Sequence, residues 1–266
     1  MAARGIDGAA VVQNQRDHCL SGPTPPALEL VDIAMTYCDG TQALSAISLD
    51  IAPGEFVSIV GPSGCGKSTL LRVAAGLETP SAGQLLTATQ SMAYVFQDAT
   101  LLPWRTCLQN AELLLELQGV PPNERRDRAS EHLALVGLQG FESHYPKQLS
   151  GGMKMRVSLA RSLALHPQIL LFDEPFASLD EITRQRLIQE LAHLHEARGF
   201  TALLVTHSVA EAIYLSDRVA VMSHRPGRIA RIFDVPLQRP RRPEQRFTSA
   251  FTAVNRAVSE TLQAVA

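Results

Sequence analysis

Short runs of apolar residues recur along the chain, separated by segments long enough to form helices. The runs cover residues 56–60, 91–96, 169–172, 202–205 and 219–222. Runs of this length, apolar at consecutive positions, are typical of strands buried on both faces of a parallel sheet. The pattern therefore predicts an α/β fold with a parallel core sheet.

The segments around these runs predict the rest of the architecture. Residues 28–57 alternate in short apolar and polar stretches, which favours a small N-terminal antiparallel β-subdomain. The region of about 98–166 is rich in leucine and charged residues at helical spacing, with helices expected at 108–117 and 124–138, and this indicates a helical insert. We expect a flexible N-terminal arm at 1–26, one main domain over 27–240, and a linker with an amphipathic helix over 241–266.

Two further helices are predicted from local signals. Residues 180–198 form a helical segment, with Ser178 and Glu181 as a capping box and Gly199 as its stop. In the last segment, 247–265, apolar residues recur three and four positions apart, so one face of that helix must be covered.

Composition excludes several classes of protein. Lys and Arg number 24 against 26 Asp and Glu, a net charge of −2 with a pI near 6.4, which does not provide the positive field of a general nucleic-acid binder. Four cysteines without a C-x-x-C pair favour a reduced, cytosolic chain over a disulfide or zinc scaffold. No apolar run approaches the roughly 18 residues of a membrane span, so we expect any membrane association to be peripheral.

A glycine-rich sequence joins the first apolar run to a helical segment that Gly76 ends. It fits G-x-x-x-x-G-K-[ST] and consists of Gly61, Pro62, Ser63, Gly64, Cys65, Gly66, Lys67 and Ser68. In a strand–loop–helix context this motif places backbone N–H groups around nucleotide phosphates. Lys67 is expected to pair with the β/γ-phosphates, and the Ser68 hydroxyl to bind Mg²⁺.

Two carboxylates follow the third apolar run. Asp173 and Glu174 stand at the carboxyl end of the strand 169–172, where open α/β sheets bind ligands. We expect Asp173 to reach Mg²⁺ and Glu174 to orient or deprotonate a water molecule. A strand that simply ends in solvated acids is the alternative, and the phosphate-binding motif makes it the weaker one.

A second anion-binding device precedes another helical segment. Ser150 is placed to cap that helix, and Gly151 and Gly152 expose its first N–H groups. This Ser-Gly-Gly segment lies between the two halves of the phosphate site and resembles the signature sequence of the ATP-binding cassette (ABC) family. Over most of the chain after the N-terminal arm, Gln97 resembles the family's Q-loop, Ser178, Leu179 and Asp180 its D-loop, and His207 its switch histidine.

The resemblance implies the residues of an ATPase site. Glu174, His207 and Gln97 are expected to be catalytic, and Ser68, Gln97 and Asp173 to bind the metal. Nucleotide contacts are expected from Tyr37, which would stack on adenine, and from Gly61, Pro62, Ser63, Gly64, Cys65, Gly66, Lys67, Ser68, Thr69, Ser150, Gly151 and Gly152. The implied cofactors are ATP and Mg²⁺.

The resemblance also implies partners. Two ATPase chains would pack head to tail, so that Ser150–Gly152 of one chain closes over nucleotide bound to the other. The dimer would bind separate permease subunits at the cytoplasmic face of the inner membrane. A solute-binding protein would act indirectly, through the permease. Met153 departs from the family's usual glutamine. Similar methionine variants, residues 101–104 and the tail 239–243 resemble the nitrate, sulfonate and taurine importers. A soluble cassette ATPase of DNA repair or translation, or a small-molecule kinase, are the alternatives.

Overall fold

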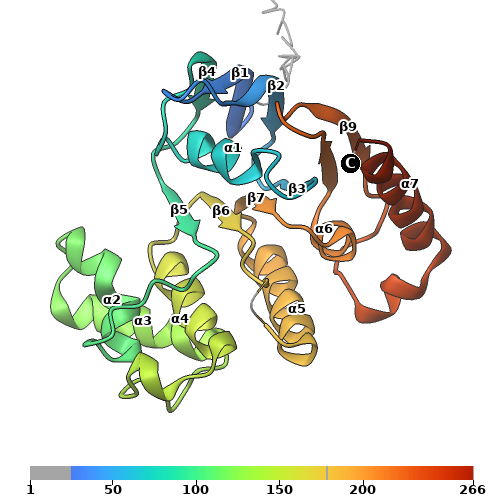
Figure 1. Cartoon of the computed structure of the whole chain (residues 1–266). Helices are drawn as coiled ribbons and strands as arrows, with labels where there is room; N and C mark the ends of the chain where they lie inside the picture. Colours follow the sequence, from blue (N-terminus) through green and yellow to red (C-terminus); the bar gives the residue numbers. More distant parts are fainter. Residues whose placement is uncertain (1–24, 178, 266) are drawn as a thin grey trace, which may run out of the picture.

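A computed structural model describes residues 25–177 and 179–265. The arm expected at 1–26 therefore lies outside the described residues except for Pro25 and Pro26. Figure 1 shows three parts: a central sheet, a smaller sheet above it, and a group of helices at the opposite end. The predicted fold class, with a parallel core sheet, an antiparallel β-subdomain and a helical insert, is confirmed.

The central sheet has the strand order β5-β6-β7-β3-β8-β9. Its members are β3 (Phe56–Val60), β5 (Met92–Val95), β6 (Ile169–Asp173), β7 (Thr201–Val205), β8 (Arg218–Met222) and β9 (Ile229–Asp234). The first five strands in this order, β5, β6, β7, β3 and β8, run parallel, and β9 pairs antiparallel with β8. All five apolar runs are strands of this sheet, and β3, β6 and β7 are buried along their whole length. Because parallel strands end at the same edge, the loops after β3, β6 and β7 are brought together.

The antiparallel sheet has the order β2-β1-β4, formed by β1 (Leu28–Thr36), β2 (Gln42–Ile51) and β4 (Ala82–Thr87). Helix α1 (Lys67–Ala74) lies between this sheet and the central one (Figure 1), and apolar residues of all three layers form one buried cluster. This packing holds the start of α1 against the ends of the central strands.

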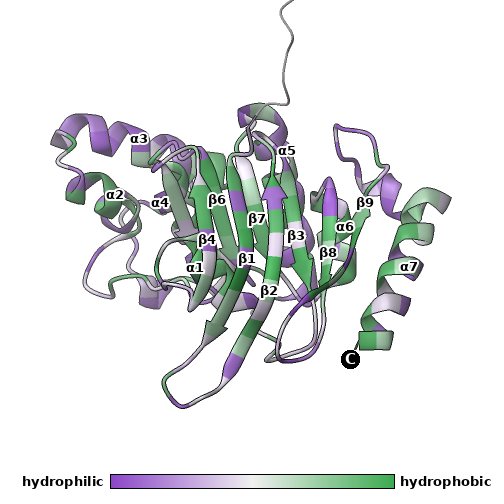
Figure 2. Cartoon of the chain, turned by 90° about the horizontal axis from the view of Figure 1, so that it is seen from above, coloured by the Kyte–Doolittle hydropathy of each residue, from purple (hydrophilic) through white to green (hydrophobic). Residues whose placement is uncertain are grey.

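The helical part contains α2 (Cys107–Leu117), α3 (Pro122–Leu135) and α4 (Gly151–Leu163), with a short 3₁₀ turn η1 (Pro146–Gln148) between α3 and α4. The helical insert is confirmed, and the predicted ends of α2 and α3 lie within three residues of the observed ones. In Figure 2 helix α3 is mostly hydrophilic, whereas the strands of the central sheet are mostly hydrophobic. No helix in the described ranges combines the length and apolar character needed to cross a bilayer.

Helix α5 (Glu181–Arg198) begins later than the capping box requires. Its N-cap is Asp180, whose carboxylate accepts a hydrogen bond from the Thr183 backbone N–H at 3.0 Å. The box of Ser178 and Glu181 is therefore wrong, because Glu181 is the first helical residue rather than the third. Ser178 itself lies outside the described residues. The predicted stop is confirmed: Gly199 follows the helix with φ 64°.

After β7 the chain forms α6 (Val209–Leu215), and after β9 a 3₁₀ turn η2 (Pro243–Phe247) and α7 (Ser249–Val265). Helix α7 packs on α6, β8 and β9 and buries Phe251 and Val258 in the main core. Helix α7 is thus tied to the central sheet through two buried residues seven positions apart.

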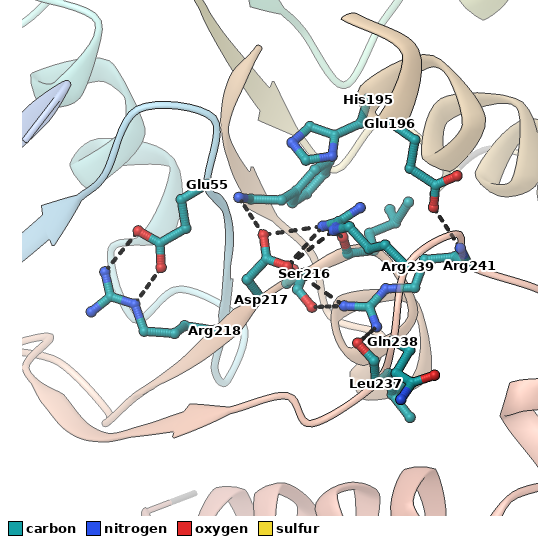
Figure 3. Close-up of polar contacts among 12 residues, drawn as sticks. Glu55, His195, Glu196, Ser216, Asp217, Arg218, Leu237, Gln238, Arg239 and Arg241 are labelled. Atoms are coloured by element: carbon teal, nitrogen blue, oxygen red, sulfur yellow. Dashed lines mark hydrogen bonds and ion pairs between the residues drawn. The ribbon is translucent and has the colours of Figure 1, made fainter. Parts of the chain in front are cut away.

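A polar cluster at the start of β8 fixes the tail that leads to η2. Figure 3 shows Asp217 accepting hydrogen bonds from the guanidinium of Arg239. Asp217 also accepts one from the Phe56 backbone N–H. Arg241 is fully buried; it donates to the carbonyls of Ser216, at 2.7 Å, and Leu237. Burial lowers the pKa of Arg241 to about 10, which still leaves it charged at neutral pH.

Candidate functional site

The glycine-rich loop runs from the end of β3 to the start of α1. Gly66 is the N-cap of α1 and has φ 105°, and Gly64 has φ 73°, conformations that side chains with a Cβ rarely adopt. A Cβ on Gly66 would lie 2.9 Å from the Ala43 carbonyl oxygen. The loop therefore packs closely on β2 and leaves its backbone N–H groups at the N-terminus of a helix, where an anion is stabilised.

Lys67 closes this loop from within. Its side chain is only 6% exposed, and Nζ donates to the carbonyl oxygens of Gly61 and Pro62 at 2.9 and 2.8 Å. The ammonium is thus held against the carbonyl groups at the start of the loop.

Asp173 connects the end of β6 to the start of α1. Its carboxylate is nearly buried and accepts two hydrogen bonds: Ser68 Oγ donates to Oδ1 at 2.8 Å, and Tyr94 Oη donates to Oδ2 at 2.9 Å. Burial is the main cause that raises the pKa of Tyr94, and the neighbouring Asp173 carboxylate adds to it, so the hydroxyl stays protonated. The predicted pair of Ser68 and Asp173 is brought together by the fold.

Glu174 and His207 form the next pair along this edge. Glu174 directly follows β6 and His207 lies two residues beyond β7. Oε2 of Glu174 is 3.2 Å from Nδ1 of His207. Glu174 has φ 45°, a left-handed conformation rare for glutamate, and its backbone N–H donates to the Val205 carbonyl. The backbone thereby turns the carboxylate toward the loop after β7.

Tyr37 reaches the same region from the turn between β1 and β2. Its hydroxyl lies 3.0 Å from Thr69 Oγ1 and donates to Glu78 at 3.2 Å. The half-buried ring is therefore tied to α1, the helix that begins at the glycine-rich loop.

Ser150, Gly151 and Gly152 lie elsewhere. Ser150 is confirmed as the N-cap of α4, since its hydroxyl accepts from the Met153 backbone N–H at 3.3 Å. They belong to the helical part, and Figure 1 shows α4 on the other side of the central sheet from α1. Gln97 is exposed just beyond β5, and Asp180 caps α5. A single chain thus assembles the site around the glycine-rich loop without the Ser-Gly-Gly segment.

Two contributors to the site carry no sequence motif. One is Tyr94 on β5. The other is the turn between β8 and β9, where Arg225 donates through Nε and Nη2 to the Gly64 carbonyl oxygen at 3.2 and 2.9 Å. In the same turn Gly227 lies so close that a Cβ there would be 2.3 Å from the Cys65 carbonyl oxygen. Only the pairing of distant segments reveals these contacts, since neither residue stands beside the glycine-rich loop in sequence.

The oxygen atoms at this edge fit a hard divalent cation. The Ser68 hydroxyl and the Asp173 carboxylate adjoin each other beside the glycine-rich loop, and Mg²⁺ is usually held by one or two such groups together with substrate phosphates. Among residues 25–177 and 179–265, no group of three or more His, Cys, Asp and Glu residues is placed to hold a metal by itself. The arrangement therefore suits Mg²⁺ that arrives with a nucleotide better than a resident transition metal.

Comparisons with known proteins show which family this chain resembles. The ABC transporter family model matches residues 44–177. The chain is 44% identical over 220 residues to a nitrate import ATP-binding protein of Synechocystis sp., covering 79% of this chain and 83% of the relative. It is also 44% identical over 254 residues to an aliphatic sulfonates import ATP-binding protein of Cupriavidus pinatubonensis, covering 92% and 81%.

One solved structure is similar to this chain along the whole length of the solved chain. It is a dimeric ATP-binding cassette in a post-hydrolysis state bound to ADP and Pi, with 34% sequence identity and a TM-score of 0.71. The match covers 79% of this chain and 100% of that one.

Proposed function

Because the chain belongs to the ABC transporter family, we propose that it is the ATP-hydrolysing subunit of an importer, which couples hydrolysis to solute uptake through separate permease subunits. ATP binding and ATPase activity follow from the family. The observation that carries the assignment of residues is the convergence of Lys67, Ser68, Asp173, Glu174 and His207 at one edge of the central sheet.

Each residue at this edge has a defined task in phosphoryl transfer, which depends on positioning and charge stabilisation. The glycine-rich loop and Lys67 hold the phosphates, and Tyr37 offers its ring to the adenine. Ser68 and Asp173 hold Mg²⁺, with Gln97 joining from beyond β5. When bound, the ion neutralises charge on the β- and γ-phosphates.

Glu174 accepts the proton of the attacking water or orients it, and His207 contacts the γ-phosphate. Their separation of 3.2 Å supports a shared task, since each side chain restrains the other. The main domain over residues 27–240 supplies this machinery, and its helical part at about 98–166 carries the segment that completes it.

Completion of the site requires a second copy of the chain. The position of Ser150–Gly152 at the start of α4, away from α1, supports a head-to-tail dimer in which each chain provides this segment to the other. The segment has the form of an anion site, since Ser150 caps a helix whose first residues are glycines. We place the dimer on the cytoplasmic face of the inner membrane, on permease subunits served by a solute-binding protein.

The names of the two relatives indicate the class of solute. One is named for nitrate import and the other for import of aliphatic sulfonates. We infer that the transported solute is a small oxyanion of the nitrate, sulfonate or taurine type. In this proposal, separate permease subunits provide the path and choose the solute.

The test separates binding from hydrolysis in the assembled transporter. Glu174→Gln removes the proton-accepting carboxylate but keeps its size, so we expect Mg-ATP affinity to persist while turnover falls at least about 100-fold, in line with the loss of a general base. Lys67→Ala should weaken nucleotide binding itself. Glu124→Gln, an exposed glutamate at the start of α3, is the matched control. Steady-state hydrolysis near the wild-type rate in Glu174→Gln would refute the role given to Glu174.

A further inference from the structure

The carboxylate of Asp173 has two oxygens, and only one of them faces α1. Oδ1 accepts from Ser68, and Oδ2 accepts from Tyr94, with both distances below 3.0 Å. An ionised carboxylate only accepts hydrogen bonds, so the Tyr94 hydroxyl must be the donor. Asp173 is therefore gripped from opposite sides, by α1 and by the edge strand of the central sheet.

The Tyr94 side chain is itself held in place next to Asp173 by the central sheet. Strand β5 pairs in parallel with β6, and Tyr94 is in register with Leu171, two residues before Asp173. The Tyr94 ring also lies 4.4 Å from the ring of Phe96, measured between centroids. The aromatic side chain and the carboxylate thus sit on adjacent hydrogen-bonded strands, and Gln97 lies two residues beyond the end of the strand that carries Tyr94.

We propose that Tyr94 is a positioning residue for the divalent cation: its hydroxyl fixes the plane of the Asp173 carboxylate, so that Oδ1 is directed toward Ser68 and the phosphates. The proposal rests on the function proposed above, because it takes Ser68 and Asp173 as the residues that hold Mg²⁺. Without the hydroxyl, the carboxylate group is free to rotate about its Cβ–Cγ bond and Oδ2 loses its protein donor.

The size of the effect follows from what outer hydrogen bonds do at metal sites. Partners that orient a ligating carboxylate typically contribute 10–100-fold to metal affinity. Tyr94→Phe removes only Oη and keeps the ring that packs on Phe96. We therefore expect the affinity for the divalent cation to fall by about tenfold, at the lower end of that range, because Ser68 continues to hold Oδ1.

The experiment uses the full chain and Mn²⁺ with a non-hydrolysable ATP analogue, AMP-PNP. Free Mn²⁺ is measured by its electron paramagnetic resonance signal, which reports binding without any turnover. Tyr94→Phe should raise the Kd for Mn²⁺ about tenfold and leave AMP-PNP binding in EDTA unchanged. In the ATPase assay the Mg²⁺ dependence should shift to higher concentration, with kcat at saturating Mg²⁺ within about threefold of wild type.

The matched control is Tyr214→Phe. The Tyr214 hydroxyl is buried, and none of the described residues forms a hydrogen bond with it, so the same atom is removed without a carboxylate partner. Its Mn²⁺ affinity should equal that of wild type. A double variant makes the test specific: if Tyr94 acts through Asp173, Tyr94→Phe has no further effect on Mn²⁺ affinity in an Asp173→Asn background.

Three results would overturn the proposal. They are an unchanged Mn²⁺ Kd in Tyr94→Phe, an equal loss of AMP-PNP binding in EDTA, and a Tyr94→Phe chain that fails to fold, since the last two would make the hydroxyl structural. If the wild-type chain itself does not bind Mn²⁺ with AMP-PNP, the proposed function fails instead. The two failures are thus distinguishable.

Discussion

The adjacent arginines Arg241 and Arg242 allow a direct test of how the tail is fixed. Arg241 is fully buried and Arg242 is exposed, although they are neighbours in sequence. Arg241→Ala removes the donors to the Ser216 and Leu237 carbonyls. An orphaned buried carbonyl costs about 1–3 kcal/mol. The Leu237 carbonyl contributes less, because that residue is half-buried and water partly replaces the donor.

The void left by the arginine side chain adds to this cost. Asp217 keeps its hydrogen bonds from Arg239, and the 3.7 Å contact from Arg241 to Asp217 is the smaller loss. We therefore expect Arg241→Ala to lower the free energy of unfolding by about 3–5 kcal/mol, the combined cost of the orphaned carbonyls and of the void left by a large buried side chain. At about 2–4 °C per kcal/mol, this is a fall in Tm of roughly 6–20 °C.

Arg242→Ala should change the free energy of unfolding by no more than about 0.5 kcal/mol, as is usual for an exposed position. Unfolding in urea is best followed by circular dichroism at 222 nm, because the single tryptophan, Trp104, is 70% exposed and reports poorly on burial. Arg241→Met, which fills most of the volume, separates the polar loss from the void. Equal stabilities of Arg241→Ala and Arg242→Ala would refute this account of the tail.

The exposure of Trp104 rules out a core role, so we expect Trp104→Ala to leave the Tm of the isolated subunit unchanged and to reduce assembly with the permease in a pull-down; a fall in Tm with intact assembly would contradict this. His195 provides a pH dependence: burial lowers its pKa from 6.5 to about 4, so the unfolded chain takes up this proton first. Stability should be complete above pH 6.5 and fall by up to about 3 kcal/mol between pH 6.5 and 4. His195→Gln should flatten the plot of Tm against pH in that window, with exposed His224→Gln as control; an unchanged slope would exclude His195 as the source.

The elements that the sequence predicted share one property: their pattern is set by burial on a regular repeat. Strands β3, β6 and β7 are buried at every position, so each is visible as an apolar run. Strand β4 was missed because it is an edge strand with most positions exposed and a glycine at its second residue. Its pairing with β1 is a tertiary property that local patterning does not contain.

The candidate site was predictable where short motifs fix backbone geometry. Lys67 and Ser68 belong to such a motif, and the acids after β6 follow from where a parallel strand ends. Tyr94 and Arg225 were not predictable, because their partners Asp173 and Gly64 are 79 and 161 residues away in sequence. The cap of α5 was also wrongly assigned, although the helix itself was predicted, since both Ser178 and Asp180 are good capping residue types and only the packed structure selects between them.

The order of strands in the central sheet has a consequence for synthesis of the chain. Strand β3 leads into the phosphate loop, yet its two neighbours are β7 and β8, and roughly 140 residues separate the end of β3 from the start of β7. At about 5–20 residues per second, a ribosome needs on the order of 7–28 s to produce that stretch. Throughout this interval β3 has neither neighbour, and the turn that braces Gly64 and Cys65 emerges later still. The glycine-rich loop is thus among the first parts of the candidate site to leave the ribosome and among the last to gain the contacts that hold it.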